Sequence, residues 1–297
     1  MKVKKGKDEK IFLGIAYVLT VLFAVICLLP FYLILVGSFT KESTILTEGY
    51  SFFLTARNFS LEAYKMAFKS PDTIVRAYGI TIFVTAVGTI TAVGLSAMTG
   101  YVLARPDFPW RNKISFFFFF TTLFSGGLVP WYLMCSKFFK FNNHVYSLIL
   151  PCLFSVWNMI IAKSFMKGIP FELTEAAKVD GAGDFRIFWK IILPAAKPLI
   201  ATIGLFTALT YWNDWYNCML YITDEDKFML QYYLQRMLGS AEAMRLVAEK
   251  SGIPITTVPL ESMKMAMTVI ATGPIILLYP FLQKYFVTGI VMGAVKE

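Results

Sequence analysis

The sequence predicts an all-α protein that crosses a membrane several times. Hydrophobic residues make up 57% of its 297 residues and charged residues only 16%, a balance that is unusual for soluble domains. The apolar residues also gather in stretches of about 20, the length that a helix needs to cross the bilayer core. We therefore expect a polytopic membrane protein with six transmembrane helices.

Six stretches of the chain meet the length criterion for a membrane span. They are residues 11–36, 77–103, 114–134, 145–166, 198–222 and 263–283. The first span follows a basic tail, residues 1–10, but it is too long for a cleaved signal peptide and no small-x-small site follows it. We expect an uncleaved anchor, so that residues 1–10 form a cytoplasmic tail and residues 11–297 form one transmembrane domain.

The distribution of Lys and Arg predicts the orientation. The net charge of +9 would suggest a nucleic-acid partner in a soluble protein, but here the position of each charge is more informative. With the N-terminus inside, sixteen basic residues lie on the cytoplasmic side and twelve lie outside, where they are spread over longer loops. The positive-inside rule then predicts that both termini are cytoplasmic, with lipid and no nucleic acid as the surroundings.

Individual spans differ in the packing that they predict. The span 77–103 is rich in Gly, Ala, Ser and Thr, which let helices approach closely, so we expect an inner, packed helix. The span 114–134 begins with FFFFF, suited to facing lipid, and continues into SGGLVP, which predicts a kink or an end. The four cysteines and the single His144 form no ligand pattern, so neither a metal site nor a disulfide framework is expected.

A polar segment, residues 167–197, separates the fourth and fifth spans. We expect a short helix over about 171–179, which Gly181 and Gly183 end, and a second helix that Asp184 caps and that runs to Pro194. Periodicity alone leaves two interpretations open. The segment is either a solvated connector that rests on lipid headgroups or a docking element for a cytoplasmic partner.

A motif in this segment carries a resemblance to a known family. Glu-Ala-Ala, three residues, Gly, nine residues and then Ile-x-Leu-Pro resembles the EAA loop of the membrane subunits of ABC importers. The matching residues are Glu175, Ala176, Ala177, Asp180, Gly181, Ala182, Phe188, Ile191, Leu193, Pro194 and Pro198. YVLAR at 101–105, WND at 212–214 and the ending QKYFVTGIVMGAVKE are similar to maltose-type carbohydrate permeases, and LFSGGLVPWYLM to their oligosaccharide branch.

The resemblance implies the fold, the partners and the place of this chain in a larger assembly. It implies a type I ABC importer permease in the bacterial plasma (inner) membrane, paired with a homologous second permease subunit. A sugar-binding protein outside the membrane would deliver the carbohydrate, and two ATPase subunits would bind ATP and Mg. The chain lacks GxxxxGK[ST], the backbone cradle for nucleotide phosphates, so we expect it to bind no cofactor and to be no enzyme. The residues implied in ATPase coupling are Glu175, Ala176, Ala177, Asp180, Gly181, Ala182, Phe188 and Pro194.

Two groups of aromatic and amide side chains are candidates for the substrate path. Sugar sites combine aromatic faces with a few convergent polar groups, and the sequence offers such chemistry at Trp157, Asn158, Tyr211, Trp212, Asn213 and Asp214. Anchoring at the membrane interface is the favoured role of the adjacent Trp215 and Tyr216, and helix packing is the favoured role of Asn158. The resemblance suggests that a loop containing Gly252, Ile253 and Pro254 contacts the binding protein.

Other function classes fit the sequence less well. An ion-coupled secondary transporter of small solutes is the alternative, but charged residues would then be expected in the middle of several spans. The spans 11–36, 77–103, 114–134 and 263–283 contain none at their centres. A membrane hydrolase would need a catalytic set that one histidine and scattered carboxylates do not supply.

Overall fold

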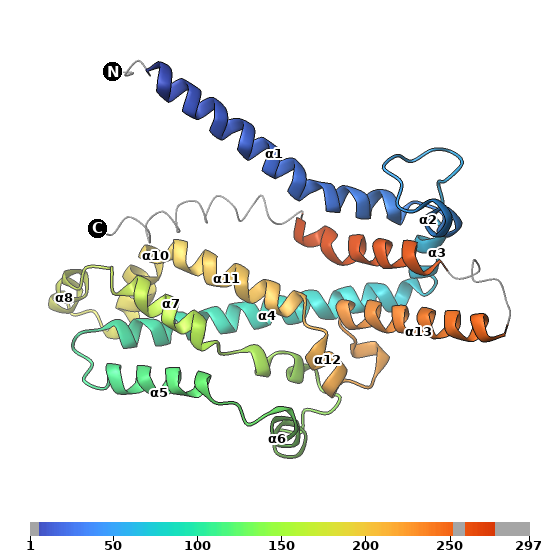
Figure 1. The fold of residues 1–297 in the computed structure, drawn as a ribbon. Coiled ribbons are helices and arrows are strands. Elements are labelled where there is room, and N and C mark those ends of the chain that lie inside the picture. The colour runs from blue at the N-terminus through green and yellow to red at the C-terminus, as the bar shows by residue number, and fades with distance from the viewer. Residues whose placement is uncertain (1–5, 252–258, 277–297) are drawn as a thin grey trace. The chain divides into compact units, whose positions relative to one another are not determined.

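The computed structural model describes residues 6–251 and 259–276, and these residues are helical throughout apart from connecting loops (Figure 1). In the described residues, the pairing of extended backbone is limited to an isolated bridge between Thr40 and Phe59. The α-helices are α1 Lys7–Ser38, α2 Glu42–Glu48, α3 Glu62–Ala67, α4 Pro71–Ala104, α5 Arg111–Leu123, α6 Leu128–Leu133, α7 Val156–Met166, α8 Glu172–Val179, α9 Asp184–Ile187, α10 Leu193–Ala195, α11 Lys197–Trp212, α12 Tyr216–Tyr221 and α13 Leu230–Lys250. A further helix occupies residues 260–276.

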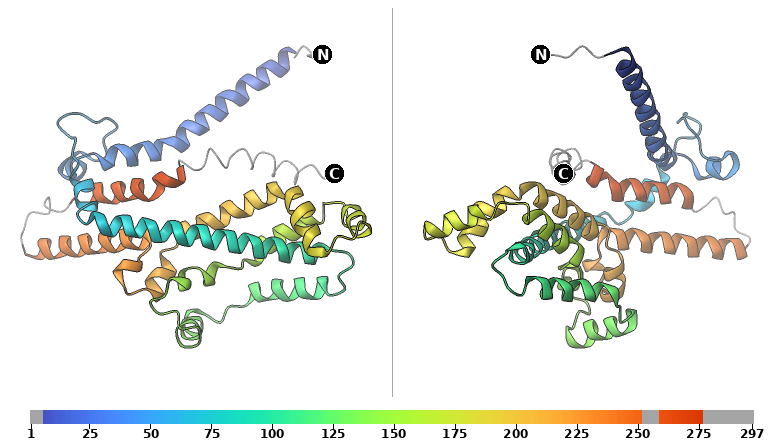
Figure 2. Two further views of the ribbon diagram at one scale, coloured as in Figure 1. Left: turned by 180° about the vertical axis from the view of Figure 1, so that it is seen from behind. Right: turned by 60° about the vertical axis from the view of Figure 1, so that its left-hand side comes forward.

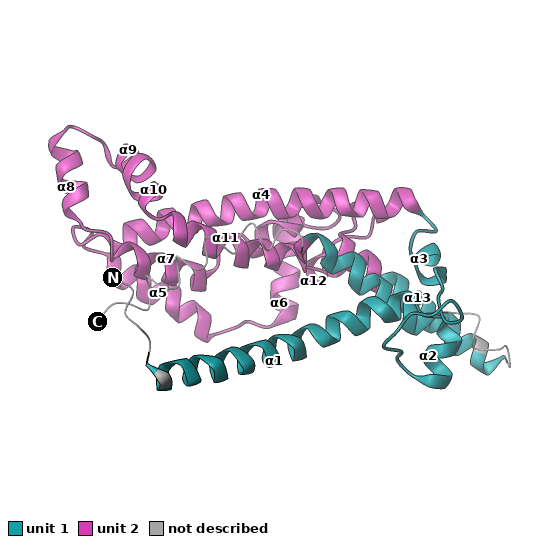
Figure 3. Cartoon of the chain, turned by 90° about the horizontal axis from the view of Figure 1, so that it is seen from above, with its two compact units in different colours: residues 1–70, 236–274 teal, residues 71–235, 275–297 magenta. Residues whose placement is uncertain are grey.

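The chain divides into two compact units, coloured separately in Figure 3. One unit combines residues 1–70 with 236–274, and the other holds 71–235 with 275–297. The second unit contains α4 to α12 and therefore both candidate sites. Each unit is described by itself below.

Helix α4 lies at the centre of the second unit, with α7 and α11 packed along it (Figures 1 and 2). Its glycines allow this close approach. A Cβ added at Gly100 would lie 2.5 Å from the Cβ of Ala162 on α7, and one added at Gly88 would lie 2.5 Å from the ring of Tyr211 on α11. The prediction of an inner, packed helix from the small residues of this span is therefore confirmed.

Helix α5 presents large aromatic side chains away from the chain, and it buries no residue. Phe116 and Phe117 are 66% and 62% exposed, as expected for side chains that face lipid. The helix ends at Leu123, and α6 leaves at an angle of 113°. The break coincides with Gly127, whose φ of +85° requires glycine, and Pro130 follows in the next turn. The predicted kink is confirmed.

Two other expected spans are also broken. The stretch 145–166 consists of 3₁₀ turns over 145–152 and then α7, with a bend of 49° between them. The stretch 198–222 is divided into α11 and α12 by residues 213–215. Neither stretch is a continuous helix, because Pro151 interrupts the first and the polar residues Asn213 and Asp214 interrupt the second.

The described residues contain two unbroken helices that are long and apolar enough to cross a membrane. These are α1 from Asp8 and α4, and three bent pairs of helices bring the total to as many as five. The expected last span, 263–283, lies partly outside the described residues. The structure thus bears out a helical membrane protein with several apolar helices.

In the first unit, polar contacts join the short helix α2 to the helix 260–276. Glu42 is buried, and its carboxylate accepts hydrogen bonds from the backbone N–H groups of Glu261 and Ser262, both at 3.0 Å. It thus satisfies donors at the start of that helix, which have no partner within the helix itself. The loop between α2 and α4 contains the short helix α3.

Candidate functional site

The segment 167–197 contains a tight glycine turn between two helices. Helix α8 ends in a Schellman motif, in which Gly181 N–H donates to the carbonyl of Lys178 at 3.0 Å and Ala182 N–H donates to that of Ala177 at 2.9 Å. Gly181 has φ = +78°, a conformation that other residues adopt only at a cost. The predicted end of the first helix at Gly181 is confirmed.

The second helical stretch is less regular than expected. Helix α9 is followed by a π-helical turn over Phe188–Ile192 and by α10, and the chain then bends by 83° into α11. The expectation that Asp184 caps this stretch is wrong. Gly183 precedes the helix, Asp184 is its first residue, and its carboxylate pairs with charged side chains from other elements.

The inner face of the segment is packed into the core of the second unit. Ala177, Ile187 and Phe188 are buried in a cluster with residues of α4, α7 and α11. The ring of Phe188 lies 5.5 Å from that of Tyr101 on α4. Because this contact is made with the central helix, a displacement of the segment would disturb α4 directly.

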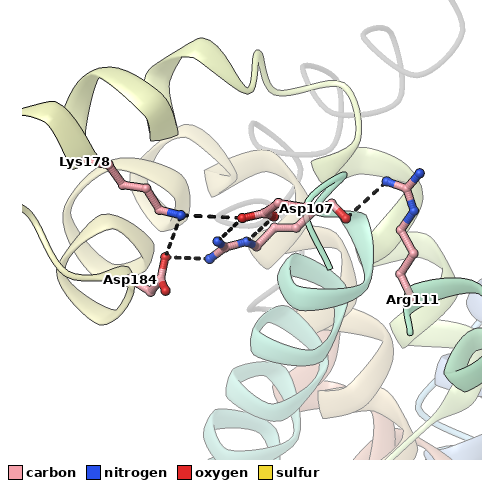
Figure 4. A network of polar contacts seen from close by, with 5 residues as sticks. Asp107, Arg111, Lys178 and Asp184 are labelled. Carbon is pink, nitrogen blue, oxygen red and sulfur yellow. Dashed lines mark hydrogen bonds and ion pairs between the residues drawn. The ribbon is translucent and has the colours of Figure 1, made fainter. Parts of the chain in front are cut away.

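A network of charges fixes the segment to the loop between α4 and α5 (Figure 4). Arg105 forms two hydrogen bonds to Asp107, at 2.9 and 2.5 Å, and a third to Asp184 at 2.6 Å. Lys178 lies 3.5 Å from Asp107 and 3.8 Å from Asp184. Lys178 and Asp184 flank the turn at Gly181 on its two sides, so these contacts hold both sides of the turn to Arg105 and Asp107.

Arg105 and Asp107 both carry their charges at neutral pH. The hydrogen bonds from Arg105 lower the pKa of Asp107 to about 2, and the same contacts raise the pKa of Arg105 above its usual value. Exposed ion pairs contribute about 0–1 kcal/mol each, but the Arg105 side chain is only 13% exposed and forks between two carboxylates. This geometry orients the segment more than it stabilises the fold.

The outer face of the segment carries large apolar side chains that no other part of the described chain covers. Leu173, Val179, Phe185 and Trp189 are all exposed, Val179 at 88%. Glu175 lies on the same helix as the first two, is exposed, and forms no ion pair within the described residues. Exposed apolar residues grouped around a charge are typical of a surface that binds another protein.

The predicted coupling residues divide between the two faces. Glu175, Ala176, Asp180, Gly181 and Pro194 are exposed, Ala182 is half-buried, and Ala177 and Phe188 are buried. Sequence reasoning did not find the network of Arg105, Asp107 and Lys178. Its only signal in the sequence is the presence of opposite charges in two loops, which does not identify partners.

Trp157 and Asn158 lie at a hollow of about 490 Å³ between α7 and α11. Trp157 is 69% exposed. Asn158 is buried, and its amide donates to the hydroxyl of Thr207 at 3.1 Å, across the two helices. Thr210 completes the polar lining. The hollow therefore combines an aromatic face with hydroxyl and amide groups.

The other four substrate-path candidates make contacts within the unit. Tyr211 is fully buried, and its hydroxyl donates to the carbonyl of Ile149 at 2.8 Å, while Trp212 is buried nearby. Asn213 accepts a hydrogen bond from Gln231 at 3.2 Å. The structure does not bring these residues together with Trp157 at one surface.

Asp214 holds the first turn of α12. Its carboxylate accepts from the backbone N–H of Asn217 at 3.0 Å and from the side-chain amide of the same residue at 2.8 Å. A buried carboxylate is satisfied by such donors. The loop residues Gly252, Ile253 and Pro254, predicted to contact a binding protein, lie outside the described residues.

Comparison with known proteins identifies the family of this chain. The model of the family described as "Binding-protein-dependent transport system inner membrane component" matches residues 4–291, nearly the whole chain. The chain belongs to this family. The resemblance drawn from the EAA-like motif is therefore confirmed at the level of the family.

Relatives of this family member include two proteins of Bacillus subtilis (strain 168). The chain is 38% identical to the polygalacturonan/rhamnogalacturonan transport system permease protein YtcP, with 97% of this chain and 99% of that protein covered. It is 39% identical to protein LplC, with 91% and 90% covered.

A solved structure shares the fold. It is a chain of a bacterial ABC transporter involved in the import of the acidic polysaccharide alginate, and the TM-score is 0.77 at 26% identity. The match covers 96% of this chain and 100% of that chain. The helical architecture is thus that of an ABC importer permease.

Proposed function

We propose that this protein is the membrane-spanning permease subunit of an ATP-driven, binding-protein-dependent oligosaccharide importer. The observation that carries the proposal is the segment 167–197, whose inner face is packed on α4 and whose outer face is apolar and uncovered within the described chain. Family membership supports it. So do relatives named for polygalacturonan/rhamnogalacturonan transport and for alginate import.

In the proposed topology the chain crosses the bacterial inner membrane six times, with both termini in the cytoplasm. The higher density of basic residues on the side of the segment 167–197 supports this orientation. A second, homologous permease subunit would complete the translocation path. An external binding protein would deliver the sugar to it.

The segment 167–197 would transmit the movement of two ATPase subunits to the helices. Its exposed side chains, Val179 and Phe185 among them, would fill an apolar cleft of the ATPase, and Glu175 would find a cation there. The buried half of the segment would then move α4, because Phe188 is in contact with Tyr101. Hydrolysis itself, with ATP and Mg, would take place on the ATPase subunits.

The hollow at Trp157 is the proposed contribution of this chain to the sugar path. An exposed indole face can pack against the CH surface of a sugar ring, and the Thr210 hydroxyl can bond to sugar hydroxyls. Asn158 already bonds to Thr207, so we assign it to helix packing first. The location between α7 and α11 places the hollow beside helices that the segment 167–197 would move.

A single substitution tests the coupling surface. Val179→Asp adds a charge at an 88% exposed position, where no contact within the described chain is lost. With the partner subunits and binding protein reconstituted in proteoliposomes, we expect loss of sugar-stimulated ATP hydrolysis and of uptake. Glu175→Lys should act in the same direction. Val247→Asp, at a 63% exposed position in α13, is the matched control.

Two outcomes would contradict the proposal. Unchanged sugar-stimulated hydrolysis in Val179→Asp would remove the docking role of the segment. Uptake that continues without ATP but stops when an ion gradient is dissipated would favour a secondary transporter of small solutes.

A further inference from the structure

A cavity of about 640 Å³ lies beside the segment 167–197, and none of the exposed apolar side chains on the outer face of the segment lines it. The ends of α4 and α7 and the beginnings of α5 and α8 form its walls. Among the lining residues are Arg111, Asn112, Lys167, Gly168 and Glu172. Neither the coupling role nor the sugar path makes use of this cavity.

The cavity is lined by two cations that form no ion pair within the described residues. Arg105 also lines it, but that guanidinium is neutralised by Asp107 and Asp184. Arg111 and Lys167 form no ion pair within the described residues. Glu172 also lines the cavity, but it forms no ion pair with Arg111 or Lys167. The two cations are therefore available to an anionic ligand.

A third cation adds to this charge. Lys163, one helical turn before Lys167, donates to the hydroxyl of Ser115 on α5 at 2.6 Å. Ser115 lies one helical turn after Arg111 on α5 and bonds to the Arg111 carbonyl, so this contact places Lys163 near both cations of the cavity. Three like charges held together by α5 and α7 raise the free energy of the empty site, and a bound anion would relieve that repulsion.

The apolar surface next to the cavity decides between a soluble anion and a lipid. Asn112 lines the cavity, and Phe116 and Phe120 follow it on α5 at successive helical turns. Both rings are exposed and 6.1 Å apart. The helix that supplies Arg111 and Asn112 to the cavity thus continues as a stripe of exposed aromatic side chains.

We propose that this cavity binds the phosphate headgroup of an anionic lipid from the inner leaflet, with one acyl chain along the Phe116 side of α5. Arg111, Asn112 and Lys167 supply the hydrogen-bond donors to the phosphate oxygens. A basic pocket between helix ends on the cytoplasmic side is suited to such headgroups. The inference rests on the topology in the proposed function, which places these helix ends at the cytoplasmic surface.

The experiment is native mass spectrometry of the purified complex of this chain with its partner subunits. Phosphatidylglycerol and phosphatidylcholine with identical acyl chains are added, and lipid retained on this chain is counted after the subunits are released. We expect preferential retention of phosphatidylglycerol. Because each basic residue near an anionic surface contributes about 1 kcal/mol, Arg111→Gln with Lys167→Gln should weaken retention about 25-fold.

Matched variants separate this site from general surface charge. The control variant, Lys10→Gln with Lys113→Gln, also removes two positive charges, but from residues that do not line the cavity. Lys10 lies near the start of α1, and Lys113 lies over the Trp110 ring. Retention should be unchanged in that variant. Lys167→Gln alone should reduce retention about fivefold. It also keeps the hydrogen bond from Arg111 to the Arg105 carbonyl, so it tests the site even if the double variant does not fold.

Three results would overturn the proposal. They are equal retention of the two lipids, equal loss in the cavity and control variants, and displacement of phosphatidylglycerol by millimolar inorganic phosphate, which would indicate a soluble anion. The assay requires no ATP. A complex that retains the lipid but shows no sugar-stimulated hydrolysis would therefore count against the proposed function alone.

Discussion

The contact between α4 and α7 at Gly100 gives the sharpest prediction for the stability of the fold. A methyl group at this position would lie 2.5 Å from the Cβ of Ala162 and 2.9 Å from two backbone atoms, the carbonyl carbon of Ala162 and the nitrogen of Lys163. A flexible side chain could move aside, but a helical backbone cannot. Gly100→Ala must therefore separate α4 from α7 over at least one turn.

The magnitude follows from comparison with a second glycine of the same helix. A Cβ at Gly94 would meet no atom within 4 Å, so Gly94→Ala changes only the helix propensity, by about 0.5–1 kcal/mol in favour of the folded state. Both substitutions gain the same helix propensity from alanine, so this contribution cancels when their free energies of unfolding are compared. The remaining difference is the destabilisation caused by overpacking at Gly100, about 1–3 kcal/mol. Contact with backbone atoms places Gly100→Ala near the upper end.

The measurement is the free energy of unfolding of the two purified variants in mixed micelles, titrated with SDS and followed by far-UV circular dichroism. Gly100→Ala should be less stable than Gly94→Ala by about 2–3 kcal/mol. Additivity errors between such variants are about 0.3–0.5 kcal/mol. A difference no larger than that would refute the close contact between α4 and α7.

Three further predictions concern polar contacts. Because the folded pKa of Asp107 is about 2, below its usual value of about 3.9, its contribution to stability is present above pH 4 and is lost as the pH falls toward 2. The melting temperatures of wild type and Asp107→Asn should therefore differ by the same amount at pH 5 and pH 8, and should converge as the pH falls from 4 toward 2. Glu42→Ala leaves buried N–H groups unpaired and should cost about 1–3 kcal/mol, measured by SDS unfolding against Glu48→Ala, an exposed residue of the same helix. A double-mutant cycle on Asn158 and Thr207 should give a coupling energy of about 0.6 kcal/mol, the average for such pairs in membranes, and a value near zero would contradict their bond.

Local features of the fold could be predicted from the sequence. The turn at Gly181 depends on one residue that tolerates a positive φ, and the break after Leu123 depends on neighbouring glycines and a proline. The inner position of α4 follows from its small side chains. Each of these features is determined within a few residues, so a short stretch of sequence contains its cause.

Contacts between distant segments could not be predicted in this way. The network at Arg105 joins residues 71 to 79 positions apart in the sequence, and no periodicity connects a loop charge to its partner. Tyr211 and Trp212 read as candidates for a sugar surface because their chemistry suits one. The bond of Tyr211 to the Ile149 carbonyl depends on how α11 lies against the 3₁₀ turns, which the sequence pattern does not determine.

The two faces of the segment 167–197 explain why one short motif contains residues of such different burial. Ala177 and Phe188 are buried against the chain's own helices, where a larger or polar side chain would loosen the segment from α4. Glu175 and Ala176 are exposed, and a change there would leave the chain intact. Substitutions on the inner face should therefore alter both the stability of this chain and the proposed coupling. Those on the outer face should alter coupling alone, so comparing the two classes measures how rigidly the segment joins an ATPase to α4.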